Sequence, residues 1–223
     1  MGTASCLSHF PYSELLQSFG SNPSVSLPDI GGIDALHRVA KRNGTSLRDI
    51  LRQATSEAHD VLDSAFHSDT LSDPDVYGDF LAMQLRARLP IERWAALNCP
   101  ASLRPPETTP EILEDLLALG RPISLRPARF EIPAAADPLG VAWAIAGSHL
   151  GNRAMLAILG KAGADLPASF LADTRMQAFW ADLKPRLDVP ADRDSARGAI
   201  VAANAVFACF TASLPAAPAR IAA

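Results

Sequence analysis

A helix-like stretch near residue 59 places a histidine among apolar side chains, where its ring could bind a metal. In the segment 47–66, steps of three and four residues put Thr55, His59 and Phe66 on one face. A neutral imidazole on an apolar face is suited to be an axial ligand of a haem iron. The alternative is a core histidine that hydrogen-bonds to a neighbour, and the spacing alone favours this alternative.

Two charged side chains on the same stretch could support such a ligand. Asp63 lies one helical turn after His59 and could orient the other ring nitrogen. Arg52 lies two turns before His59, in a suitable place to pair with a propionate carboxylate.

A second stretch, residues 137–155, gathers small residues on one helical face. They are Gly140, Ala144, Gly147, Gly151 and Ala154. A glycine inside a helix costs about 1 kcal/mol relative to alanine, so its presence indicates that something approaches the helix backbone closely. Either another helix or a flat ligand would satisfy this, and the Gly147-Ser148 pair is also a place where a helix can bend. His149 lies about 200° of helical rotation from Gly147 and from Gly151, so we do not expect it to be a ligand.

The rest of the sequence predicts an all-α fold that would position these two stretches. Asp73-Pro74, Thr109-Pro110 and Asp137-Pro138 each place a capping oxygen before a proline at the first helical position. From Thr45 onward, β-branched residues do not alternate and no Asn-Gly or Asp-Gly turn joins two strand-like runs, so no sheet is expected. We expect helices at 46–67, 74–98, 110–120, 138–163, 174–187 and 192–214.

The chain divides by composition into three parts. Residues 1–44 are rich in Ser, Pro and Gly, and we expect them to form a poorly ordered or loosely docked extension. Residues 45–214 form the helical domain, and residues 215–223 form a C-terminal tail. The length of 223 residues is compatible with one such domain.

Composition excludes several classes of protein. Lys and Arg number 20 against 24 Asp and Glu, and this net charge of -4 argues against a nucleic-acid-binding protein. Cys6, Cys99 and Cys209 lie too far apart for a zinc or CxxC motif and suit a reducing compartment. There is no apolar stretch long enough to span a membrane and no signal peptide, so we expect a cytoplasmic protein.

The two motifs together resemble the biliverdin-producing haem oxygenase family, and most closely its bacterial, bacteriophytochrome-associated members. The likeness rests on the segment Leu51-Arg-Gln-Ala-Thr-Ser-Glu-Ala-His59-Asp-Val-Leu-Asp63, followed about 90 residues later by Gly147-Ser148-His-Leu-Gly151. It covers roughly residues 45–214. The resemblance implies a single-domain multi-helix bundle, with haem between a proximal helix and a kinked distal helix.

On the proximal side, the resemblance implies roles for five residues. His59 would be the iron ligand, Asp63 would support it, and Arg52 would lie near the propionates. Thr55 would belong to the same haem-binding face. Phe207, in the last predicted helix, would form part of an aromatic wall.

On the distal side, Gly147 and Gly151 would let the helix come close over the haem and leave room for dioxygen. Ser148 falls where animal members carry an aspartate that organises water. The sequence departs from the family at Asn152, in place of a second glycine, and at Ser56, in place of a second basic residue near the propionates. We expect Asn152 to crowd or hydrogen-bond the distal side.

The reaction that the resemblance implies is the oxidative cleavage of haem to biliverdin, carbon monoxide and ferrous iron. Haem would be both substrate and cofactor, and dioxygen the oxidant. Electrons would come from an external ferredoxin or reductase, and a bacteriophytochrome is the implied acceptor of biliverdin. Two alternatives stay open: a haem-binding or haem-sensing protein of the same fold with weak or no turnover, and a haem-free helical interaction module.

Overall fold

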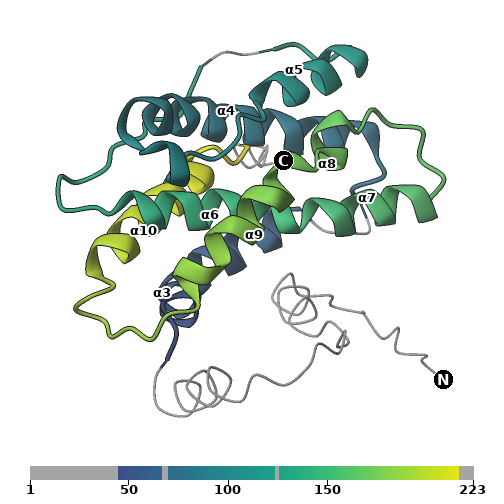
Figure 1. Ribbon diagram of the computed structural model, residues 1–223. Helices are drawn as coiled ribbons and strands as arrows, with labels where there is room; N and C mark the ends of the chain where they lie inside the picture. Colours follow the sequence, from purple (N-terminus) through teal and green to yellow (C-terminus); the bar gives the residue numbers. More distant parts are fainter. Residues whose placement is uncertain (1–44, 67–69, 124–125, 216–223) are drawn as a thin grey trace, which may run out of the picture.

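The computed structural model describes residues 45–66, 70–123 and 126–215, and this part of the chain is all-helical (Figure 1). The helices are α3 (Leu47–Ala65), α4 (Pro74–Asn98), the short 3-10 helix η1 (Ala101–Leu103), α5 (Thr109–Ala118), α6 (Pro138–Leu150), α7 (Asn152–Lys161), α8 (Ser169–Ala172), α9 (Arg175–Leu187) and α10 (Arg197–Ala212). The predictions for residues 1–44 and for nearly all of the tail lie outside the described residues. None of the described helices combines the length and hydropathy of a membrane-spanning segment.

Local sequence explains where several of these helices begin. The Asp73 side chain accepts hydrogen bonds from the backbone of Asp75 and Val76, and the Asp137 side chain accepts one from the backbone of Leu139. These are the N-cap bonds that an acidic residue before proline is expected to make. The predicted starts of α4 and α6 are therefore confirmed.

The start of α5 differs from its prediction. Thr109, expected as the cap, is the first helical residue, and Thr108 takes the cap position without a side-chain capping bond. The backbone amides of Thr108 and Thr109 instead donate to the carboxylate of Glu92 on α4, at 2.8 and 3.4 Å. A residue distant in sequence therefore supplies the cap, which is why the local pattern misplaced it.

The stretch predicted as one helix over 138–163 is two helices in the structure. α6 ends at Leu150 and α7 starts at Asn152, with Gly151 between them at φ −70° and ψ −21°. The dihedrals of Gly151 stay in the right-handed helical region, so the chain bends there without reversing. The last helix also starts later than expected, at Arg197, because Asp192 and Ser195 hydrogen-bond to each other in a turn.

Helix α10 is central to the packing. It lies against α3 on one side and α6 on the other, while α9 covers α6 and α4 packs on α5 (Figure 1). The contact between α6 and α10 is close, because a Cβ atom added to Gly140 would lie 2.0 Å from the carbonyl oxygen of Ala199.

The start of α3 is also tied to the segment between α9 and α10. The backbone amide of Leu47 donates to the carbonyl of Val189, and that of Ala191 donates to Thr45, both at 3.0 Å. These two bonds flank an isolated antiparallel bridge between Ser46 and Pro190.

Candidate functional site

The structure brings together three of the residues expected on the proximal side. Nδ1 of His59, on α3, lies 3.1 Å from Oδ2 of Asp63, and the His59 side chain is 22% exposed. The ring centroids of His59 and Phe207 are 6.0 Å apart. A carboxylate that accepts the Nδ1 proton selects the tautomer whose lone pair is on Nε2, the nitrogen that a metal would bind. The role of His59 as an iron ligand stays a prediction.

Phe207 connects this part of α3 to α6. The Phe207 ring, on α10, is buried, and its centroid lies 6.4 Å from that of Trp143 on α6. One aromatic side chain of α10 therefore lies near both His59 on α3 and Trp143 on α6. The expectation that Phe207 forms an aromatic wall beside haem stays a prediction.

The other two proximal residues have contacts of their own within α3. Thr55 is buried, and its hydroxyl donates to the carbonyl of Leu51 at 3.0 Å. Arg52 is exposed, and its Nη2 lies 3.8 Å from Oδ1 of Asp49. An exposed pair of this kind contributes little to stability, so the Arg52 side chain can change partner at small cost.

The glycines on α6 have different surroundings. Gly140 is required by packing, because no side chain fits between its Cα and the α10 backbone. Gly147 is half-buried, and a Cβ added there would meet only Trp180, at 4.0 Å, an ordinary van der Waals distance. Helix packing therefore explains Gly140 and does not explain Gly147.

The polar side chains after Gly147 bond toward α4 and α8. Ser148 Oγ accepts from Nη2 of Arg88, on α4, at 3.0 Å and donates to the carbonyl of Ile145. The Asn152 amide nitrogen lies 2.9 Å from Nδ1 of His149 and 3.4 Å from the carbonyl oxygen of Phe170. The structure thus places the Asn152 amide in buried contacts with His149 on α6 and with the α8 backbone. The expectation that Asn152 crowds or hydrogen-bonds the distal side of a haem stays a prediction.

His149 has a protein partner at each ring nitrogen. Its Nε2 donates to the carbonyl of Asp173 at 3.0 Å, which leaves Nδ1 to accept from the Asn152 amide. Burial, together with the nearby positive charge of Arg88, lowers the pKa of His149 to about 4. His149 is therefore neutral near pH 7.

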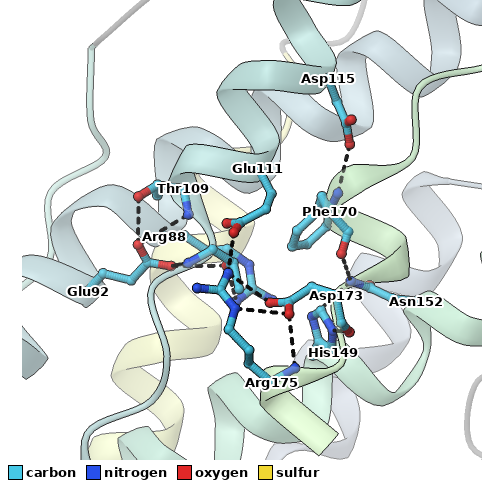
Figure 2. A network of polar contacts seen from close by, with 11 residues as sticks. Arg88, Glu92, Thr109, Glu111, Asp115, His149, Asn152, Phe170, Asp173 and Arg175 are labelled. Carbon is cyan, nitrogen blue, oxygen red and sulfur yellow. Dashed lines mark hydrogen bonds and ion pairs between the residues drawn. The ribbon is translucent and has the colours of Figure 1, made fainter.

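The sequence analysis missed a polar network centred on Arg88 (Figure 2). Arg88 has no solvent exposure, and its Nε donates to Gln84 at 2.9 Å while Nη1 donates to the Thr108 hydroxyl at 3.3 Å. Its guanidinium carbon also lies 5.1 Å from the Phe170 ring centroid and 5.8 Å from that of Phe210.

Glu92 is the nearby anion on the same helix. Its carboxylate accepts four hydrogen bonds, from the backbone amides and the hydroxyls of Thr108 and Thr109. The Thr108 hydroxyl therefore donates to Glu92 and accepts from Arg88. The signal that could have revealed this network is the repeat of polar residues every four positions, Gln84, Arg88 and Glu92, which places them on one face of the helix.

A second set of polar side chains, Asp115, Glu111 and Arg175, holds α8 and the start of α9 in place (Figure 2). The buried carboxylate of Asp115 accepts from the backbone amides of Ser169 and Phe170, at 2.8 and 2.9 Å, and burial raises its pKa. Arg175 pairs with both Asp173 and Glu111. These contacts fix the backbone that the His149 ring bonds to.

No cluster of three or more His, Cys, Asp or Glu side chains that could hold a metal ion occurs in the described part of the chain.

Comparison with family models, with curated proteins and with solved structures finds no match to this chain. The haem oxygenase resemblance therefore rests on the two sequence motifs.

Proposed function

We propose that this protein binds haem and cleaves it oxidatively to biliverdin, carbon monoxide and ferrous iron. The observation that carries the proposal is the His59–Asp63 pair beside Phe207, with Gly147, where a methyl group would fit, on α6. A carboxylate-supported histidine next to aromatic side chains is a donor set that fits a haem iron. A glycine puts no side chain of its own between the helix backbone and the flat face of a macrocycle.

Each residue would have a defined task. His59 would hold the iron through Nε2, and Asp63 would keep the Nδ1 proton in place and so orient the ring. Phe207 and Trp143 would contact the macrocycle, while Gly147 and Gly151 would keep side-chain atoms away from its other face. Haem, when bound, supplies the iron that binds and activates dioxygen.

The remaining parts of the proposal rest on the resemblance and on the sequence composition. Electrons would come from a ferredoxin or a reductase, and a bacteriophytochrome would accept the biliverdin. The reaction would take place in the cytoplasm. Arg52 is exposed and weakly paired, so it could turn to a propionate carboxylate.

One observation favours the alternative of a haem-binding protein with weak or no turnover. The charged side chain bonded to Ser148 is Arg88, and an arginine does not give up a proton near neutral pH. Ring opening consumes protons, so proton delivery would need water molecules or other groups.

A haem titration followed by absorbance tests the proposal. We expect a saturable Soret shift, and then, after ascorbate or a reductase is added in air, decay of that band and growth of a broad red band. Binding without decay would favour the alternative of a haem carrier or sensor. No shift at all would contradict both.

The ligand assignment is tested by His59→Ala. We expect loss of the iron–imidazole signature with helical content nearly unchanged, because the His59 side chain is part-exposed and alanine is a good helix former. Glu57→Ala, an exposed substitution on the same helix, is the matched control. An unchanged haem spectrum in His59→Ala would rule out His59 as the ligand.

A further inference from the structure

Arg88 is a fully buried cation whose hydrogen bonds join two helices. Transfer of a guanidinium group out of water is costly unless its donors find partners, and Arg88 finds them in Gln84, Thr108 and Ser148. Gln84 belongs to the same helix, and Thr108 lies at the start of α5. Ser148 is the partner on α6, so the Arg88–Ser148 bond links α4 to the helix that carries Gly147.

The bond to Arg88 also fixes the direction of the Ser148 hydroxyl. Its oxygen accepts from Arg88 Nη2, and its proton goes to the carbonyl of Ile145 at 2.9 Å. Ser148 follows Gly147 directly and precedes the interruption at Gly151 by three residues. The bond therefore acts on the part of α6 where the helix loses its regular form.

The guanidinium of Arg88 is also hydrogen-bonded on the side that faces the start of α5. Arg88 Nη1 donates to the Thr108 hydroxyl, which donates to the Glu92 carboxylate at 3.0 Å. A continuous series of hydrogen bonds thus runs from the anion of Glu92 to the α6 backbone, and each donor has an acceptor. Hydrogen bonds with ionised groups are roughly twice as strong as neutral ones.

We propose that Arg88 is a positioning residue that acts through Ser148 to fix the α6 backbone between Gly147 and Gly151. On the proposed function, on which this inference rests, that backbone is the surface lying over haem. Arg88 then determines which edge of the macrocycle stays accessible, without touching haem itself.

Hydrogen exchange of the haem-free protein tests the positioning role directly. Ser148→Ala removes the acceptor, and Arg88→Lys keeps the charge but loses the forked geometry. We expect amides of residues 147–155 to exchange about tenfold to a hundredfold faster in both variants, because a buried bond to a charged group is lost. Ser148→Thr keeps the hydroxyl and should restore protection.

Ser213→Ala is the matched control. Ser213 is also buried, directly after the end of α10, and its hydroxyl donates to a carbonyl of that helix, that of Cys209 at 2.8 Å. This variant should leave exchange at residues 147–155 unchanged. If Ser148→Ala exchanges there as Ser213→Ala does, the positioning role of Arg88 is overturned.

A second measurement uses the haem complex. We expect Ser148→Ala to keep the Soret position of the unaltered protein, since that reports on the axial histidine, and to shift the proportion of biliverdin isomers. Ser148→Thr should restore the original proportion, and an unchanged proportion in Ser148→Ala would overturn the inference. Failure of the unaltered protein to bind haem would instead refute the proposed function, and hydrogen exchange would still decide the role of Arg88.

Discussion

Gly140→Ala should destabilise the protein, even though alanine is the better helix former. The added Cβ would lie 2.0 Å from the carbonyl oxygen of Ala199, 2.8 Å from its carbonyl carbon and 2.9 Å from its Cα. All three atoms belong to the α10 backbone, so no side-chain rotation can relieve the overlap. Ordinary carbon–oxygen contacts begin at about 3.3 Å, so α6 and α10 would have to move apart by about 1 Å.

The size of the effect follows from two opposing contributions, the first of which we place at its upper end because the overlap is with backbone atoms. Overpacking of this kind costs typically about 1–3 kcal/mol and occasionally more. Alanine returns about 1 kcal/mol through its helix propensity. We therefore expect a net loss of about 2 kcal/mol. For a chain of this size, that loss lowers Tm by about 4–8 °C.

Thermal unfolding followed by circular dichroism measures the change, with Gly147→Ala as the matched control on the same helix. Gly147 has room for a methyl group, so its variant should gain up to about 1 kcal/mol and melt about 2–4 °C higher. The same control should bind haem more weakly if the proposed function holds. A Gly140→Ala protein as stable as the unaltered one would refute the packing argument.

Two further predictions concern titratable side chains. Asp63→Asn should weaken haem binding about tenfold to a hundredfold with little change in Tm, because the carboxylate orients the His59 ring; absorbance titration measures this, and unchanged affinity would contradict the supporting role of Asp63. The pKa of His149, about 4, lies below its ordinary value, so the unfolded chain takes up a proton that the native protein does not as pH falls from about 6.5 to 4. The free energy of unfolding should therefore drop by up to about 3 kcal/mol more in the unaltered protein than in His149→Gln, as measured by urea unfolding at pH 7 and pH 4.5. Equal drops in both proteins would contradict this assignment, in which Arg88, Asp173 and Arg175 are the charged neighbours of the ring.

The sequence predicted those features that depend on residues close together in the chain. Asp73 and Asp137 cap the helices that follow them, and Asp63 contacts His59 one turn away, because these contacts span only two to four residues. The all-helical composition of the described residues was predictable for the same reason, since periodicity and caps are local signals.

Contacts between distant segments were not predictable in this way. The Arg88–Ser148 bond spans 60 residues, and the cap that Glu92 supplies to α5 spans 16. The Gly147-Ser148 pair indicated that the helix could bend, but not that it would end at Leu150, and the dihedrals of Gly151 are still helical. Gly140, and not Gly147, is the α6 glycine that packing requires, because α10 lies against Gly140. The position of α10 cannot be read from the sequence near either glycine.

The bridge between Ser46 and Pro190 has a consequence for the position of His59. The two backbone bonds beside it clamp the first turn of α3 to the segment that leads into α10. The helix is uninterrupted from these two bonds to His59. The direction in which the imidazole points and its position along the helix axis therefore depend on the number of residues in between. One residue inserted between them would swing the ring about 100° around the helix and raise it about 1.5 Å. The number of residues between Leu47 and His59, twelve positions along one continuous helix, therefore determines that the imidazole lies next to Phe207.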